Sequence, residues 1–364
     1  MRLIGKEEIE NIAIGAALLG TGGGGDPYIG KLMALQAVEE YGPIRLLDPE
    51  EVPDDALVVP SAMMGAPTVM VEKIPNGDEA VAAFKALEEY LGKKIYATMP
   101  IEAGGVNSML PLALAARLGL PVIDADGMGR AFPELQMVTF HLEGVSATPM
   151  VISDEKGNSL LLNTIDSVWA ERIARKATIE MGGSVMNAIY QMDGKTMKKS
   201  SIHHILSLEE KIGARIRTAL KNSKHPIDEI LELTNGHQLF QGKVTDIDRK
   251  TQDGFAKGTA SIEGIGSNTG KTCKLHFQNE HLLAEVDGQV VCVTPDLIAV
   301  LDAETGMPIT TEGLRYGARC LVIGMPCDPK WRTPKGIEVA GPEYFGYSAP
   351  YQPVEELVLV KEEV

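Results

Sequence analysis

Cysteine is scarce in this sequence, and its spacing excludes two common structural devices. The four cysteines all lie after residue 272, and no two of them form a CxxC pair. Zinc ribbons need such pairs and small disulfide-stapled folds need a denser set, so we expect reduced thiols. The chain also lacks a secretory signal pattern and any apolar run long enough to cross a bilayer. We therefore expect a cytoplasmic protein with no membrane partner.

Positive charge is also in short supply. The chain has 34 Lys and Arg against 50 Asp and Glu, a formal net charge of −16. Proteins that bind nucleic acids neutralise phosphates with a surplus of basic residues, so this balance argues against a nucleic-acid partner. Residues 168–224 reverse the trend, with 11 Lys and Arg against 5 Asp and Glu. We expect this stretch to pack on the acidic remainder of the chain or on another subunit, as in a homo-oligomer, with DNA binding as the less favoured alternative.

Residues 1–165 show the alternation of strands and helices that is typical of an α/β domain with a mixed, mainly parallel sheet. Short apolar runs between turn residues predict buried parallel strands at 56–61, 94–98 and 121–123, and residues 44–47 are expected to add another strand. Apolar residues at helical spacing predict intervening helices at 79–91 and 108–118. Three further runs predict antiparallel additions to the sheet, at 137–142, 150–152 and 160–163.

The remainder of the chain divides into two parts of different character. Residues 166–235 have a helical pattern, interrupted by Gly182 and Gly183, and we expect them to pack on the α/β domain. Residues 236–364 contain short alternating runs separated by Gly, Asp and Asn, which predict an all-β barrel or sandwich.

A run of four glycines is the most unusual feature that the sequence does contain. Residues 19–27 read LGTGGGGDP and follow a helical pattern over residues 7–19. Asp26 suits a helix N-cap and Pro27 the first helical position, so a second helix is expected to begin here. Backbone N–H groups at such a helix start can bind an anion.

Three interpretations of the glycine loop remain open. A nucleotide phosphate loop is disfavoured, because such loops follow a strand and a P-loop carries Lys-Ser or Lys-Thr. A helix–helix turn with close backbone packing needs no ligand at all. The favoured interpretation is a loop that anchors a substrate or stabilises an oxyanion, formed by Thr21, Gly22, Gly23, Gly24, Gly25 and Asp26.

Polar residues follow two of the predicted parallel strands. Glu102 and Asn107 come after the strand at 94–98, and Asp124, Asp126 and Arg130 come after the strand at 121–123. Because ligands bind at the carboxyl ends of parallel strands, we expect these side chains to converge. Paired carboxylates there could perform acid–base catalysis or bind a divalent metal ion. The structural alternative is that Asp124 caps a loop and Asp126 pairs with Arg130.

The histidines and the C-terminal polar residues are weaker signals. His203 and His204 are adjacent and do not share a helix face, so we expect loop residues rather than a metal pair. Asn279 and Glu280 lie on a predicted hairpin, and together with nearby His and Asp side chains they could complete a site between the domains. Turn chemistry explains Asn279 equally well. The cysteines in predicted strands are expected to be buried and inert.

Seven motifs occur in a characteristic order along the chain. They are LGTGGGGDP (19–27), EAGGVN (102–107), PVIDADGMGRAFPE (121–134), QNEHL (278–282), PDLI (295–298), LRYG (314–317) and FGY (345–347). Together they resemble the DUF917 family, also described as S-methyl thiohydantoin desulfurases, over residues 5–351. The resemblance implies an α/β domain and a β-rich domain, hydrolytic removal of sulfur from a five-membered ring, and association with hydantoinase or oxoprolinase-type proteins.

The residues and the resemblance lead to one main hypothesis. The chain is predicted to be a hydrolase acting on a cyclic amide or thiohydantoin ring, with amides of the glycine loop as an oxyanion hole. Glu102 or Asp124 would accept the water proton, and Asp126 would orient the water or protonate the leaving group. Asn107 and Arg130 would hold the ring. The alternatives are metal-assisted hydrolysis and a non-catalytic subunit that binds a hydantoinase-type partner through the basic stretch.

Overall fold

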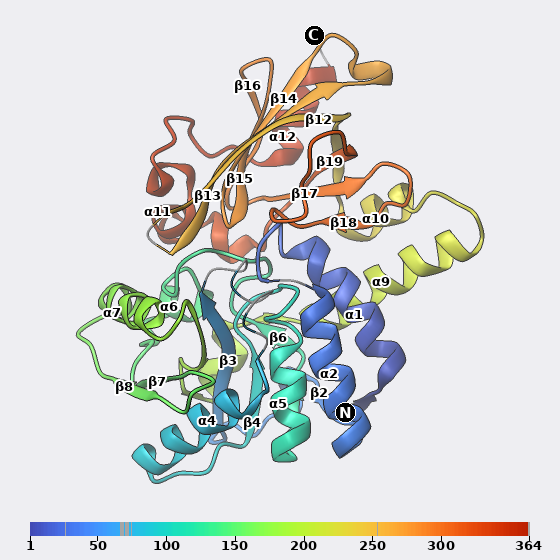
Figure 1. The fold of residues 1–364 in the computed structure, drawn as a ribbon. Helices are drawn as coiled ribbons and strands as arrows, with labels where there is room; N and C mark the ends of the chain where they lie inside the picture. Colours follow the sequence, from blue (N-terminus) through green and yellow to red (C-terminus); the bar gives the residue numbers. More distant parts are fainter. Residues whose placement is uncertain (26, 66–68, 70–72, 74, 253, 363–364) are drawn as a thin grey trace.

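The computed structural model describes residues 1–362 except 26, 66–68, 70–72, 74 and 253, and Figure 1 shows their arrangement. An α/β domain lies below a domain of long antiparallel strands, and the chain ends on the latter. The α/β fold with a β-rich C-terminal part is therefore confirmed. No helix in the described part of the chain is both long and apolar enough to cross a membrane.

The N-terminal sheet has nine strands around a parallel centre. Its hydrogen-bonded order is β1-β2-β5-β4-β3-β9-β7-β8, with β10 also paired to β3. The strands β2, β5, β4 and β3 are parallel, and every other pairing in this sheet is antiparallel. The bounds are β1 Arg2–Ile4, β2 Ile44–Leu47, β3 Leu57–Gly65, β4 Ala97–Pro100, β5 Val122–Ile123, β7 Met150–Ser153, β8 Ser159–Leu162, β9 Ser184–Ala188 and β10 Met192–Asp193.

The central strand β3 is buried on both faces, which explains its unbroken apolar sequence. Val59 and Met63 pack with α4 (Asp78–Leu91) and α5 (Leu110–Leu118) on one face. Ala62 and Met64 belong to the larger core on the opposite face, where α7 (Ser167–Glu180) covers β3 and β9. Both layers leave the carboxyl ends of β3 and β4 facing the C-terminal domain.

Two predicted elements are wrong. Residues 137–142 contain a short helix, α6 (Thr139–Leu142), instead of a strand. A buried apolar run of this length is compatible with either state, so periodicity could not decide between them. Residues 184–188, assigned to the helical middle segment, form β9 in the N-terminal sheet. The positive φ angles of Gly182 and Gly183 turn the chain from α7 into this strand.

The C-terminal sheet has eight antiparallel strands in the order β16-β15-β14-β13-β12-β19-β17-β18. It folds back on itself, so that β15 and β16 pack against β17, but its ends do not pair. The result is an open, sandwich-like sheet rather than a closed barrel. The bounds are β12 His237–Gln252, β13 Phe255–Gly264, β14 Thr272–Gln278, β15 Glu280–Val286, β16 Gln289–Val293, β17 Leu297–Asp302, β18 Pro308–Ile309 and β19 Arg319–Met325.

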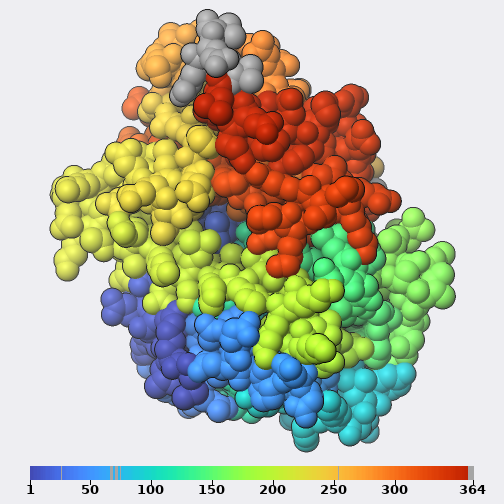
Figure 2. Space-filling model, turned by 180° about the vertical axis from the view of Figure 1, so that it is seen from behind, coloured from blue at the N-terminus to red at the C-terminus, as the bar shows by residue number. Residues whose placement is uncertain are grey.

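The middle segment joins the two domains at the back of the molecule. In Figure 2 its yellow and yellow-green residues run between the blue N-terminal residues and the red C-terminal residues. It contains α9 (Ile205–Lys221), which packs along α1 (Lys6–Leu19), and α10 (Ile227–Thr234). The predicted helix over 7–19 is thus confirmed, and α2 (Pro27–Tyr41) begins at Pro27 as expected.

Two glycines allow α1 and α9 to pack backbone against backbone. A Cβ at Gly15 would lie 2.0 Å from the Glu209 carbonyl oxygen, and one at Gly213 would lie 2.0 Å from the Asn11 carbonyl oxygen. Each helix therefore contributes one glycine to a reciprocal contact that no larger residue fits.

We predict that Gly213→Ala lowers the free energy of unfolding by about 1–3 kcal/mol, because the added methyl group forces α9 away from α1. The exposed Lys211→Ala on the same helix is the control, with an expected change within about 0.5 kcal/mol. Urea denaturation measures both. Equal stabilities of G213A and K211A would contradict this account of the packing.

Candidate functional site

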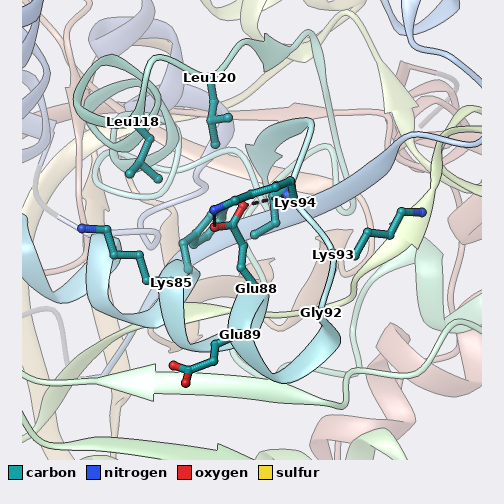
Figure 3. A pocket seen from close by; sticks show the side chains of 10 residues that line it. Lys85, Glu88, Glu89, Gly92, Lys93, Lys94, Leu118 and Leu120 are labelled. Carbon is teal, nitrogen blue, oxygen red and sulfur yellow. Dashed lines mark hydrogen bonds and ion pairs between the residues drawn. The ribbon is translucent and has the colours of Figure 1, made fainter.

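A cavity of about 610 Å³ beside the C-terminal end of α4 is not the best candidate for a site. Figure 3 shows Lys85 and Lys93 pointing away from each other, while Glu88 and Lys94 form an ion pair of 2.8 Å within it. Its polar groups thus neutralise one another or diverge, and none converges on a common point.

A smaller cleft between the two domains has the opposite character. Its open space is about 50 Å³, the volume of one or two water molecules. Walls come from the end of β3, the glycine loop, residues 101–107 and 128–135, α7 and the start of β15. The polar side chains that line it are Glu102, Asn107, Glu134, Arg175, Asn279 and Glu280. This cleft lies at the carboxyl ends of β3 and β4, where the sequence predicted a site, and it is the candidate described below.

Gly24 and Gly25 are the members of the glycine loop that line the cleft. The carbonyl of Gly24 accepts hydrogen bonds from the backbone N–H groups of Val106 (2.9 Å) and Asn107 (3.3 Å). A Cβ at Gly24 would lie 2.4 Å from the Cα of Gly104, so two glycine-rich loops touch directly. Gly24 and Gly25 also have positive φ angles of 75° and 88°, a backbone conformation that favours glycine over other residues.

The first half of the loop instead connects the domains. The Thr21 carbonyl accepts from the His281 N–H (2.8 Å), and the Gly22 carbonyl accepts from the Thr311 N–H (2.8 Å). Gly23 packs on the Glu280 carboxyl group, and a Cβ added at Gly23 would lie only 1.9 Å from Glu280 Oε1. Asp26, also predicted as a site residue, lies outside the described residues.

Glu102 is the carboxyl group that the α/β domain contributes to the cleft. It is 6% exposed, and its Oε1 accepts from Asn107 Nδ2 at 2.5 Å. Its Oε2 accepts from the Phe132 N–H at 3.1 Å. Burial raises the pKa of Glu102 to about 7, although these two hydrogen bonds and the charge of Arg130 favour the ionised form. Asn107 is itself fixed by the Met63 N–H, which donates to its Oδ1 (2.7 Å).

Glu280 is the matching carboxyl group from the C-terminal domain. It is 2% exposed, and its Oε2 has no hydrogen-bond partner among the described residues. Burial raises its pKa well above the usual range, and the nearby charge of Glu102 raises it further. Asn279 shapes this corner with a positive φ of 61° and two hydrogen bonds to Ala256, one through its Oδ1. Two acids from different domains therefore share one enclosed cleft.

Arg130 is fully buried and holds the surroundings of both acids. Its Nη1 donates to the carbonyls of Pro295 (3.1 Å) and Asp296 (2.7 Å). Its Nη2 donates to Thr21 Oγ1 and to the His281 carbonyl, each at 3.0 Å. Burial lowers the pKa of Arg130 to about 10, and Glu280 is the main opposing charge. Arg130 thus remains a cation at neutral pH and joins the glycine loop to the C-terminal sheet.

Asp124 and Asp126 do not line the cleft. Asp124 accepts hydrogen bonds from the N–H (3.0 Å) and the hydroxyl (2.5 Å) of Ser207, near the start of α9. Both oxygens of Asp126 accept from the Gly129 N–H, at 3.0 and 2.8 Å, and burial raises its pKa well above the usual range. Asp126 lies near another buried acid, Glu209, which accepts from Ser108 Oγ at 2.7 Å.

The histidines and cysteines contribute little to the cleft. His204, with a positive φ of 64°, precedes α9, and His276 contacts Glu285 at 3.3 Å. His281 is buried against the Ile298 carbonyl, and burial lowers its pKa to about 4. All four cysteines are buried, and none of them forms a disulfide bond with another described residue. Among the residues that the structure describes, no three His, Cys, Asp or Glu side chains are arranged to hold a metal ion.

Sequence reasoning missed Arg175 and the methionines of the cleft. Arg175 projects from α7, donates to Glu171 and to the Pro133 carbonyl (3.0 Å), and stacks on Phe255 at 4.1 Å. On a predicted helix, the sequence carries no signal that distinguishes such an arginine from one that faces solvent. Met63, Met64 and Met128 line the cleft with Phe132, and nothing in a buried strand sequence distinguishes such residues from ordinary core.

Two family models together match almost the whole sequence. The S-Me-THD-like N-terminal domain matches residues 7–164, and the S-Me-THD-like C-terminal domain matches residues 165–354. The chain belongs to the S-Me-THD-like family. The resemblance inferred from the seven motifs is thereby confirmed, and membership suggests an enzymatic, hydantoin-related and desulfurase-like function.

The fold of this S-Me-THD-like protein is similar to the crystal structure of a protein from Chromobacterium violaceum. The two chains are 24% identical, with a TM-score of 0.78, and the match covers 97% of this chain and 100% of the other. At this level of identity the likeness concerns the fold alone. No curated protein matches the sequence.

The raised pKa of Glu102 makes a prediction for stability. An acid that holds its proton more tightly when folded stabilises the fold at low pH, and this contribution is lost as the pH rises from about 4.5 to about 7. Glu102→Gln keeps the shape but cannot ionise. The free energy of unfolding of the wild type should therefore fall relative to E102Q by on the order of 2–3 kcal/mol across this window.

Chemical denaturation at a series of pH values measures this difference. A difference that is constant between pH 4.5 and 7 would show that Glu102 ionises normally in the folded protein, contrary to its enclosed position.

Proposed function

We propose that this protein is a hydrolase that removes the sulfur substituent from an S-methyl thiohydantoin or a closely related five-membered ring. Family membership supports the class of ring. The observation that carries the proposal is the pair of buried carboxyl groups, Glu102 and Glu280, which face one cleft from two domains. Neighbouring acids whose environments set their pKa values apart are suited to opposite roles in acid–base catalysis.

Glu102 is the proposed general base. The Asn107 amide and the Phe132 N–H donate to its two oxygens, and Arg130 lies near, so the ionised form is stabilised despite burial. A water molecule attacks the trigonal ring carbon that bears sulfur, and Glu102 accepts its proton. A carbon–oxygen bond forms and negative charge develops on the ring.

Glu280 is the proposed general acid. Its pKa is raised above that of an ordinary carboxyl group, and Arg130 and Glu102 oppose each other in setting its charge. Protonated Glu280 transfers its proton to the leaving thiolate as the carbon–sulfur bond breaks. The net reaction consumes one water and yields a hydantoin and methanethiol. Transfer of one proton from Glu102 to Glu280, directly or through solvent, returns both acids to their starting states.

The remaining walls supply binding rather than proton transfer. Gly24 and Gly25 line the cleft, and their backbone N–H groups would stabilise the charge that develops on the ring, as in an oxyanion hole. Met63, Met64 and Met128 offer a polarisable apolar surface to a methylthio group. Asp124 and Asp126 would contribute indirectly, by holding in place the loop that carries Arg130. Because the cleft holds only about 50 Å³ of open space, it must widen when the ring enters.

The test is turnover of S-methyl thiohydantoin, followed by thiol release and by loss of ring absorbance. Glu102→Gln and Glu280→Gln should each lower kcat/KM by about 10²–10⁴-fold, the usual contribution of a general acid or base. Glu79→Gln is the matched control, because Glu79 is also buried but only caps the turn at Asn76 and Gly77. In the wild type, kcat/KM should rise with pH through about 7 as Glu102 ionises.

Full activity of E102Q and E280Q would contradict the assignment. An isolated chain that never releases thiol, but restores turnover when added to a hydantoinase-type protein, would favour the non-catalytic subunit instead.

A further inference from the structure

Asn187 has a buried side-chain amide to which neither the packing nor the proposed mechanism gives a role. The residue is 0% exposed, and neither its Oδ1 nor its Nδ2 has a hydrogen-bond partner among the described residues. Leaving a buried polar group without a partner is costly, so most such groups in folded proteins are paired. Asn187 carries two such atoms in the middle of the sheet, where its cross-strand neighbours on this face, Ala62 and Ile152, are apolar.

The register of the sheet places Asn187 next to the cleft. In β9 it lies directly opposite Ala62 of β3, and side chains opposite each other in an antiparallel pair share one face. Ala62 and its neighbour Met64 both line the cleft. On the other side Asn187 is paired with Ile152 of β7, and α7, which carries the cleft residue Arg175, covers this face. Asn187 itself does not line the cleft, whereas its cross-strand neighbour Ala62 does, so the cleft must widen beside Ala62 for a ring to reach the amide.

We infer that Asn187 recognises the amide edge of the ring substrate. The inference rests on the proposed function for the class of ligand. In a five-membered cyclic amide the N–H and C=O groups are held on one edge, because the ring forces the cis arrangement. A carboxamide presents one acceptor and one donor side by side, so it can form two parallel hydrogen bonds to that edge, as Asn does with adenine.

This assignment explains why the amide lacks protein partners. The Glu280 carboxyl group, whose Oε2 is likewise unpartnered, faces the cleft from the opposite domain. A ring that enters the widened cleft would give hydrogen-bond partners to Glu280 on one side and to Asn187, beside Ala62, on the other. Asn187 would fix the ring by its amide edge, and Glu102 and Glu280 would act on the carbon that bears sulfur.

The experiment compares two rings by isothermal titration calorimetry: hydantoin, and 1,3-dimethylhydantoin, which has no N–H group. The wild type should bind hydantoin more tightly. Asn187→Leu, of similar size, should weaken hydantoin binding by about 10- to 100-fold and abolish the preference. It should also raise the melting temperature, because it removes two unpaired polar groups from the core.

Thr178→Val on α7 is the matched control. Thr178 is buried, but its hydroxyl donates to the Ala174 carbonyl at 2.8 Å. T178V should not raise the melting temperature, and it should keep the preference for hydantoin.

Three results would overturn the inference: wild-type protein that does not distinguish the two rings, unchanged hydantoin affinity in N187L, or a lower melting temperature of N187L with the preference retained. The last result would mean that a structural partner holds the amide. Wild-type protein that binds hydantoin and passes these tests, but never releases thiol, would refute the proposed hydrolysis and leave the recognition by Asn187 standing.

Discussion

The buried guanidinium of Arg130 is the interaction on which the arrangement of this protein depends. Its five N–H groups reach the glycine loop, its own loop, β15 and the turn before β17, and all but one of their acceptors are backbone carbonyls. Removing such a cation from water is costly and is offset only when every donor is satisfied. The segments that satisfy it also enclose the cleft, so the same contacts hold the two domains together and build the site.

The same interaction connects the cleft to the end of the chain. Asp296, whose carbonyl binds Arg130, accepts side-chain hydrogen bonds from the Cys327 N–H, Arg332, Tyr351 and the Val354 N–H. The C-terminal segment thereby holds the turn that holds Arg130. Around this cation the acids differ by environment: Glu102 is hydrogen-bonded in its ionised form, whereas Glu280 is enclosed with an oxygen unpaired. That contrast is the physical basis for giving them different roles.

The sequence indicated the parallel strands, and with them the edge at which Glu102 and Asn107 meet, because buried strands are readable from apolar runs between turns. It could not indicate which way each side chain points after a strand ends. Asp124 and Asp126 follow the same strand as Arg130 yet bond to Ser207 and to the Gly129 N–H. The sequence also did not predict the position of Asn187. Strand β9 returns to the first sheet after α7, and only the pairing of β9 with β3 brings Asn187 beside Ala62.

The central claim is that water, activated between the two domains, replaces sulfur on the ring carbon. Turnover of S-methyl thiohydantoin in ¹⁸O-labelled water, with mass spectrometry of the product, tests it directly. If water is the nucleophile, the product is hydantoin with one ¹⁸O in its new carbonyl group, and one methanethiol is released for each ring. Release of thiol without ¹⁸O in the ring would contradict this claim, because the atom that replaced sulfur would then not have come from water.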